Sequence, residues 1–311
     1  SEKFKGEKGD LDCTYYVLKD NLAKAKKQFQ DVPKMLKAFE YWFGPYPFYE
    51  DSYKLVEAPY LGMEHQSSIT YGNGFQNGYR GRDLSGTGWG LKFDFIIIHE
   101  SGHEWFANSI TSKDIADMWI HESFTNYSES LFVEYYYGKE AGFEYVRGTR
   151  KGIDNDKPII GHYDVNSEGS SDMYPKGGNM LHTLRQIVNN DEKWREILRG
   201  LNSTFYHQTV TTKQIEDYLS NATGVNLTAF FNQYLRDTRI PTLEYFFKKG
   251  FINFRWTNCV SGFDMPVKVT LNGAEQVLAP KTEWKNIATK TENQKLDVNR
   301  NFYVASFNIT E

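Results

Sequence analysis

Residues 95–103 read Phe-Ile-Ile-Ile-His-Glu-Ser-Gly-His, an apolar run that ends in two histidines four positions apart. The pattern predicts a buried helix. Residues four apart lie on one helix face, so His99 and His103 can present ring nitrogens to one Zn²⁺ ion at about 2.0–2.1 Å. Glu100 would lie beside the metal, where it can take a proton from a water molecule that the metal activates.

A zinc ion that supports chemistry needs a third protein ligand and an open fourth position. Residues 119–124 read Trp-Ile-His-Glu-Ser-Phe and place an acid, Glu122, on a second predicted helix. Eighteen residues separate His103 from Glu122. We therefore expect one zinc ion per chain, bound by His99, His103 and Glu122.

Four separated motifs together resemble the aminopeptidase N family of gluzincins, a group that includes leukotriene hydrolase. The spacing H-E-x-x-H, 18 residues, Glu is that of the family. Residues 103–108 are similar to its H-x-W-F-G-N, with Ala107 in place of glycine, and residues 119–124 to its W-x-x-E-x-F. Residues 62–65, Gly-Met-Glu-His, resemble its G-x-M-E-N with His65 in place of asparagine, and residues 174–177 resemble its Y-x-K-G.

The resemblance implies a zinc aminopeptidase, and it gives each motif a role. Glu100 is the general base, and Tyr174 donates its hydroxyl to the oxyanion of the reaction intermediate. Glu64 holds the free α-ammonium group of the substrate by a charge-assisted hydrogen bond. The main-chain N–H groups of Gly62 and Met63 orient the substrate carbonyl. The expected partner is a peptide with a free N-terminus.

The predicted fold class is α+β. Residues 22–43 have the apolar spacing of helices, divided in two at Pro33 and ended by Gly44-Pro45. Short β-favouring pieces lie at 54–56 and 68–71, and further helical patterns cover 92–108, 119–137, 139–150, 176–189, 192–205, 212–219 and 228–236. The resemblance implies that these form a thermolysin-like, mainly helical catalytic domain with a small edge sheet.

The pattern changes after Ile240-Pro241. Residues 251–256, 267–271 and 302–307 are short β-branched or aromatic segments, and Asn272-Gly273 is a hairpin signal. We therefore expect two domains, a peptidase domain at 1–240 and a small β-sandwich at 241–311. The resemblance also implies flanking domains, so we expect an N-terminal β-domain that lies outside this chain.

Composition excludes several classes of protein. The 311 residues include 36 basic and 40 acidic side chains, a balance that argues against nucleic-acid binding. No apolar run is long enough to span a membrane. The two cysteines, Cys13 and Cys259, cannot form a disulfide scaffold or a cysteine zinc site. The chain begins at Ser1 without a visible targeting segment, and we expect a soluble protein, with a periplasmic or secreted location preferred over a cytoplasmic one.

Three other functions remain open from the sequence. A zinc endopeptidase would leave Glu64 without a role, and an epoxide hydrolase of the same fold would act on a lipid. A catalytically silent, zinc-containing binding module is the third alternative. Lone histidines such as His65 and His121 receive no catalytic role, because such residues are more often surface or core side chains than ligands.

Overall fold

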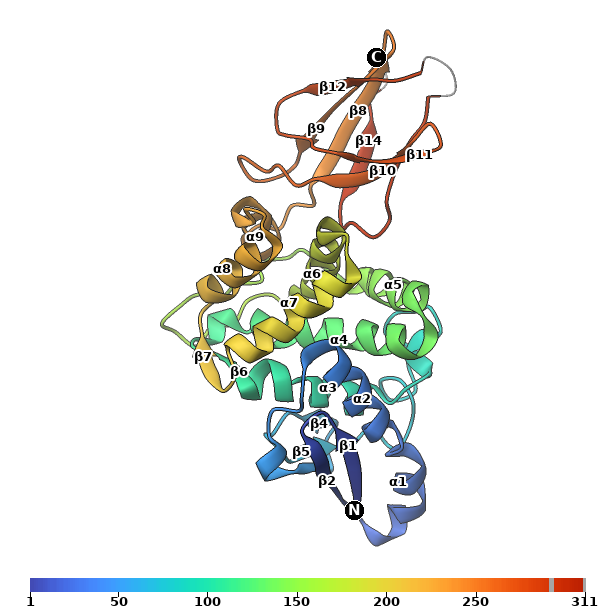
Figure 1. The fold of residues 1–311 in the computed structure, drawn as a ribbon, viewed down its shortest axis with the longest axis vertical. Coiled ribbons are helices and arrows are strands. Elements are labelled where there is room, and N and C mark those ends of the chain that lie inside the picture. The colour runs from blue at the N-terminus through green and yellow to red at the C-terminus, as the bar shows by residue number, and fades with distance from the viewer. Residues whose placement is uncertain (291–293, 310–311) are drawn as a thin grey trace.

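The computed structural model describes residues 1–290 and 294–309, which form a body of helices with small sheets at both ends (Figure 1). The helices are α1 (Leu22–Gln28), α2 (Asp31–Phe43), α3 (Phe95–Gly102), α4 (Trp119–Tyr137), α5 (Lys139–Gly148), α6 (Pro175–Val188), α7 (Asp191–Thr204), α8 (Thr212–Thr223) and α9 (Thr228–Arg236). Every helix predicted after residue 110 is present, and each end lies within four residues of its predicted position.

A five-stranded sheet lies at the N-terminal end of the body, in the order β1-β2-β3-β5-β4. Its strands are β1 (Glu2–Gly6), β2 (Gly9–Tyr16), β3 (Tyr53–Glu57), β4 (Gly62–Met63) and β5 (Ile69–Tyr71). Strands β2, β3 and β5 are parallel, and α1 and α2 connect β2 to β3. The short strand β4 pairs antiparallel with β5 and forms the edge of the sheet.

Helix α2 follows local sequence rules closely. Pro33 lies in its first turn, where the missing N–H would have no acceptor within the helix. Gly44 ends the helix with a φ of +93°, a conformation that glycine adopts without steric cost. Val32, Leu36 and Phe39 lie on the buried face, as the apolar spacing predicted.

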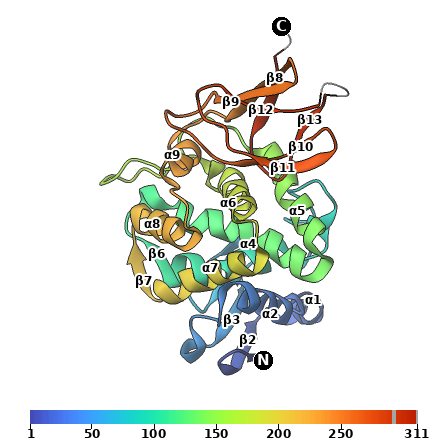
Figure 2. The ribbon, with the colours of Figure 1, turned by 45° about the horizontal axis from the view of Figure 1, so that its top comes forward.

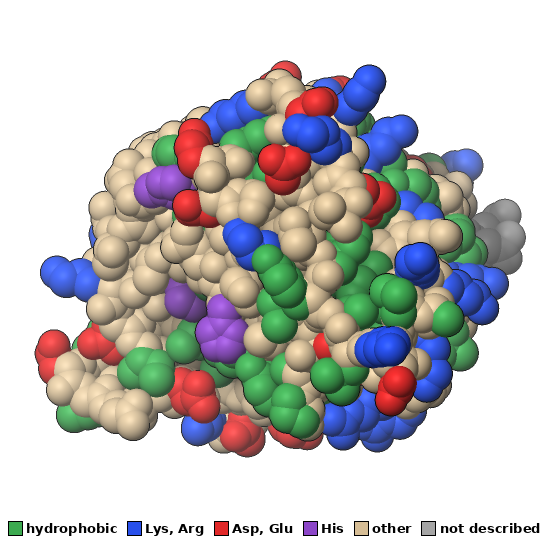
Figure 3. Space-filling model, turned by 90° about the horizontal axis from the view of Figure 1, so that it is seen from below, with side chains coloured by type: hydrophobic (Ala, Val, Ile, Leu, Met, Phe, Trp, Pro, Cys, Tyr) green, Lys and Arg blue, Asp and Glu red, His purple; other side chains and the backbone are tan. Residues whose placement is uncertain are grey.

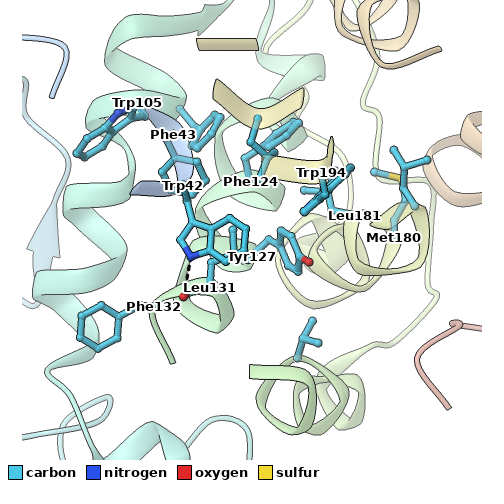
Figure 4. Close-up of a cluster of buried hydrophobic side chains, with 14 of the residues drawn as sticks. Trp42, Phe43, Trp105, Phe124, Tyr127, Leu131, Phe132, Met180, Leu181 and Trp194 are labelled. Carbon is cyan, nitrogen blue, oxygen red and sulfur yellow. Dashed lines mark hydrogen bonds between the residues drawn. The ribbon is translucent and has the colours of Figure 1, made fainter. Parts of the chain in front are cut away.

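The core of the helical body is aromatic (Figure 4). Trp42 from α2 donates a hydrogen bond from Nε1 to the main-chain oxygen of Leu131 in α4, at 3.1 Å. Tyr127 of α4 packs against Trp194 of α7, with ring centroids 6.3 Å apart. Burial of side chains this large provides much of the hydrophobic stabilisation of a domain. Helix α4 therefore lies at the centre of the body and is held in place by α2 and α7.

A short two-stranded sheet within the body pairs β6 (Ile110–Ser112) with β7 (Gln208–Val210) in parallel. The C-terminal strands are β8 (Thr242–Lys248), β9 (Phe251–Thr257), β10 (Val267–Leu271), β11 (Ala274–Leu278), β12 (Lys285–Ala288), β13 (Leu296–Val298) and β14 (Ala305–Asn308). They form two sheets, β12-β9-β8-β14 and β11-β10-β13, beyond the helices (Figure 2). Asn272 and Gly273 form the predicted β10–β11 turn, with φ values of +50° and +85°.

The change from helices to strands falls between Arg236 and Thr242. The two C-terminal sheets contribute buried residues such as Leu243 and Val269 to the apolar core, as a β-sandwich requires. This architecture confirms the predicted α+β class. The division into domains at residue 240 stays a prediction.

The lysines of α1 are exposed, as expected for a solvated helix face. Figure 3 shows Lys and Arg side chains gathered toward the side of the molecule on which α1 lies. Among the residues that the structure describes, no helix has both the length and the apolar character needed to cross a bilayer.

Candidate metal centre and active site

Helix α3 positions the two histidines of the H-E-x-x-H motif. Asp94 begins the helix, and its carboxylate accepts hydrogen bonds from the main-chain N–H groups of Ile96 and Ile97 at 3.1 and 3.4 Å. All eight residues of the helix are buried. Because α3 packs against α4, the histidines face the first turn of α4, where Glu122 lies.

The structure brings His99, His103 and Glu122 together. Nε2 of His99 lies 3.5 Å from Oε2 of Glu122, and Nε2 of His103 lies 3.4 Å from the same oxygen. The two imidazole rings are nearly perpendicular, with centroids 5.0 Å apart. Three potential ligand atoms of these residues lie within 4.8 Å of one another.

This cluster fits a zinc ion. Two ligands about 2.0–2.1 Å from one tetrahedral ion lie about 3.4 Å apart, which agrees with both distances to Glu122. Oε2 of Glu122 is buried and has no hydrogen-bond partner, so a cation would satisfy it. Burial opposes ionisation of Glu122, but His103 and His99 outweigh it and hold the pKa of its carboxyl well below the usual value. Two imidazoles and a carboxylate are a donor set that zinc prefers.

The other ring nitrogen of each histidine fixes its orientation. Nδ1 of His99 donates to Oε1 of Glu129 at 2.8 Å, and the hydroxyl of Tyr145 donates to Oε2 of Glu129 at 2.6 Å. Nδ1 of His103 donates to the main-chain oxygen of Phe106 at 3.0 Å. These bonds direct each Nε2 at the cluster, and loss of the Nε2 proton on metal binding leaves that nitrogen free to act as a ligand while Nδ1 donates.

Sequence reasoning missed Glu129 and Tyr145. Glu129 lies seven residues after Glu122, so it lies on the same face of α4 two turns later. That spacing is a signal that could have identified Glu129. Tyr145 comes from α5 and meets Glu129 only through the packing of α5 on α4, for which the sequence offers no local signal.

Glu100 lies beside these three candidate metal ligands. Oxygens of Glu100 and Glu64 and a nitrogen of His103 lie within 4.8 Å of one another. Burial raises the pKa of Glu100, the two histidines lower it, and the carboxylates of Glu64 and Glu122 raise it further, so that the pKa lies above the usual value. A raised carboxyl pKa suits a group that accepts and then returns a proton.

Strand β4 brings the next predicted residues against α3. A Cβ atom on Gly62 would lie 2.7 Å from Cγ2 of Ile96 and 3.1 Å from Oε1 of Glu100, so this close approach needs glycine. Met63 follows and is 43% exposed. Glu64 directly follows β4, the strand at the edge of the sheet, and is only partly buried.

Tyr174 lies immediately before α6. Its ring stacks over that of His99, with centroids 6.0 Å apart and planes at 24°. Burial and then the Glu122 carboxylate raise the pKa of Tyr174, so its hydroxyl keeps its proton at neutral pH. It can therefore donate a hydrogen bond at the site.

The predicted continuous helix over residues 92–108 is wrong. Helix α3 ends at Gly102, and a π-helical segment, Glu104–Ser109, follows, in which the N–H of Asn108 donates to the oxygen of His103 at 2.9 Å. Ala107 has φ 158° and ψ −55°, a backbone conformation that favours glycine, the residue of the family motif. The apolar periodicity continues through this break, which is why the sequence pattern did not show it.

His121 lies outside the cluster. Its Nε2 accepts a hydrogen bond from the N–H of Ser112 at 2.9 Å, and burial lowers its pKa to about 4. It is therefore a neutral side chain that holds β6 against α4.

The sequence matches a known peptidase family and is similar to several known proteins. The model of the peptidase family M1 domain matches residues 28–234. Leukotriene A-4 hydrolase of Xenopus laevis is 25% identical over 229 residues, which cover 69% of this chain and 36% of that protein. Aminopeptidase N of Lactobacillus helveticus is 26% identical over 229 residues, which cover 64% of this chain and 26% of that protein. The chain thus spans about a third or less of each of these two relatives.

A solved structure shares the whole fold. The crystal structure of Legionella pneumophila aminopeptidase A in complex with aspartic acid superposes with a TM-score of 0.74 at 12% identity, covering 100% of this chain and 38% of that chain. An M1 zinc metallopeptidase from Deinococcus radiodurans, bound to a Tyr-Ser-Ala substrate, gives a TM-score of 0.56 at 18% identity, covering 76% of this chain and 50% of that chain. These likenesses confirm the predicted fold class.

Proposed function

Because the chain belongs to peptidase family M1, we propose that it is a zinc-dependent aminopeptidase that removes amino acids from the free N-terminus of peptides. The family match covers α2 to α8, most of α9 and all the segments that carry the predicted metal ligands. Relatives named aminopeptidase N support the reaction class.

The observation that carries the proposal is the position of Glu64. Its carboxylate lies within 4.8 Å of an oxygen of Glu100 and a nitrogen of His103, at the end of an edge strand that passes against α3. A partly exposed carboxylate next to a metal centre can bind a substrate ammonium group by a charge-assisted bond. A peptide anchored there by its N-terminus would present its first peptide bond to the metal centre, which favours an exopeptidase over an endopeptidase.

Different side chains carry out the separate steps of peptide hydrolysis. Zinc, when bound by His99, His103 and Glu122, supplies a Lewis acid that polarises the substrate carbonyl and lowers the pKa of water. Glu100 takes the proton of the attacking water and returns it to the leaving amine. Tyr174 donates its hydroxyl hydrogen to the carbonyl oxygen as that atom gains negative charge.

The test is hydrolysis of short peptides and aminoacyl amides, each prepared with a free and an acetylated N-terminus, in the presence of one equivalent of zinc. We expect the free forms to be cleaved much faster than the acetylated forms, and both activities to be lost in Glu100→Gln. Glu196→Gln is the matched control, because Glu196 is an exposed acid on α7 that lies outside the site.

Cleavage of the acetylated forms at comparable rates would remove the role of Glu64 and identify an endopeptidase. A zinc-loaded, folded protein that cleaves neither form would be a catalytically silent binding module.

A further inference from the structure

One asparagine joins the metal centre to the predicted amine anchor. The side-chain Nδ2 of Asn108 donates to the main-chain oxygen of Glu64 at 2.8 Å. The main-chain N–H of Asn108 donates to the oxygen of His103 at 2.9 Å. Two hydrogen bonds through a single residue therefore link a predicted zinc ligand to Glu64.

A buried carboxylate fixes the direction of this asparagine. Glu104 is fully buried, and its Oε1 accepts a second bond from Nδ2 of Asn108 at 3.0 Å. The same oxygen accepts from the N–H of Ser67 at 2.9 Å, and Oε2 accepts from the hydroxyl of Tyr46 at 2.6 Å. A buried side chain with this many partners has little freedom to move.

The segment 64–67 is thereby held at both ends. Asn108 binds the carbonyl of Glu64, and Glu104 binds the N–H of Ser67. Residues 65–68 form a turn that overlaps this segment, because the N–H of Ser68 donates to the oxygen of His65 at 3.0 Å. Both contacts come from the π-helical segment that follows α3. The segment that interrupts the helix therefore also holds residues 64–67 in place.

We propose that Asn108 is a positioning residue that fixes Glu64 relative to the metal centre and so sets the preference for a free N-terminus. The inference rests on the proposed aminopeptidase function, in which Glu64 binds the substrate ammonium group. A misplacement of about 1 Å in such a contact can lower a rate by about 100-fold. Loss of the Asn108 bond should therefore weaken the selection of free over acetylated substrates more than it weakens hydrolysis itself.

The experiment compares Asn108→Ala with the unaltered chain and with Asn202→Ala. Asn202 is a matched control, because it is a buried asparagine whose Nδ2 donates to a main-chain oxygen, that of Leu198, at 3.0 Å in α7. The readout is the ratio of kcat/KM for a free aminoacyl amide to kcat/KM for its acetylated form. Both rates come from one preparation, so the fraction of folded protein cancels.

We expect Asn108→Ala to lower this ratio at least about tenfold, mainly through a higher KM for the free substrate, while its zinc content stays at one per chain. Asn202→Ala should leave the ratio unchanged. A purely structural role for Asn108 would lower both rates together, and an unchanged ratio would overturn the inference.

If Asn108→Ala does not fold, Asn108→Ser provides the second variant, since its hydroxyl is too short to reach Glu64 but keeps a polar group at the position. If the unaltered chain itself shows no preference for free termini, the proposed function fails. If it does and the Asn108 variants keep that preference, only the positioning role fails.

Discussion

Replacing Glu129 by glutamine tests whether the metal centre depends on the residue behind His99. Oε1 of Glu129 accepts from Nδ1 of His99 at 2.8 Å, and both residues are at most 5% exposed. Glutamine keeps the shape and one acceptor oxygen but removes the charge. Tyr145 can still bond to the new amide, because its hydroxyl can accept as well as donate.

The magnitude follows from the lost charge. A hydrogen bond to a charged group contributes about 1.5–3 kcal/mol, and a change of 1.4 kcal/mol is tenfold in an equilibrium constant. We therefore expect the zinc dissociation constant of Glu129→Gln to rise about 10–100-fold. Tyr145→Phe removes only the outer bond to Glu129 and should raise the constant by less.

The assay is competition for zinc between the protein and a coloured chelator at neutral pH. Thermal unfolding should show that each variant remains folded, and Glu196→Gln provides the charge-loss control on the surface. A dissociation constant for Glu129→Gln within about threefold of the unaltered chain would refute the reasoning, because a buried charge that orients a ligand cannot be removed without effect.

Desolvation raises the pKa of the buried Asp94 to about 6, against about 3.9 in an unfolded chain. The folded state therefore holds this proton more tightly, and the free energy of unfolding should fall by about 3 kcal/mol as the pH rises from about 3 to 7. Urea unfolding should show that Asp94→Asn lacks this decline, and the same decline in the variant would contradict the assignment. Ala107→Gly should raise the free energy of unfolding by about 1 kcal/mol, since relief of the strained φ outweighs the entropy that glycine adds to the unfolded chain; a less stable variant would show that Ala107 is not strained. Tyr174→Phe should lower kcat about 100–1,000-fold with little change in KM, whereas a change in KM alone would indicate a packing role.

The sequence predicted those parts of the fold that have local signals. Helix α4 begins at Trp119 and ends at Tyr137, the bounds that its apolar pattern predicted. The hairpin β1–β2 was not predicted, although the buried Leu11 and Cys13 alternate with the exposed Asp12. Strand β2 is also stabilised by its parallel pairing with β3, a contact for which the sequence has no local signal.

The residues of the site also fall into those that have a local signal in the sequence and those that do not. His99, Glu100 and His103 form one motif on one helix, so their spacing is visible in the sequence. Glu129 and Asn108 act through contacts that form only when α3, α4 and the segment after β4 pack together. The break after Gly102 was also hidden, because the apolar residues continue through Phe106, where the backbone is no longer helical.

The parallel pairing of β6 with β7 bears on the order of folding. Ile110 lies opposite Gln208, so this contact joins residues 98 positions apart. Closing a loop of that length in an unfolded chain costs about 4 kcal/mol of entropy, unless the helices between the strands have already shortened it. The predicted zinc ligands and Glu129 lie within residues 99–129. On a chain that leaves the ribosome N-terminus first, the whole ligand cluster is synthesised well before β7, so metal capture need not wait for the helical body to close.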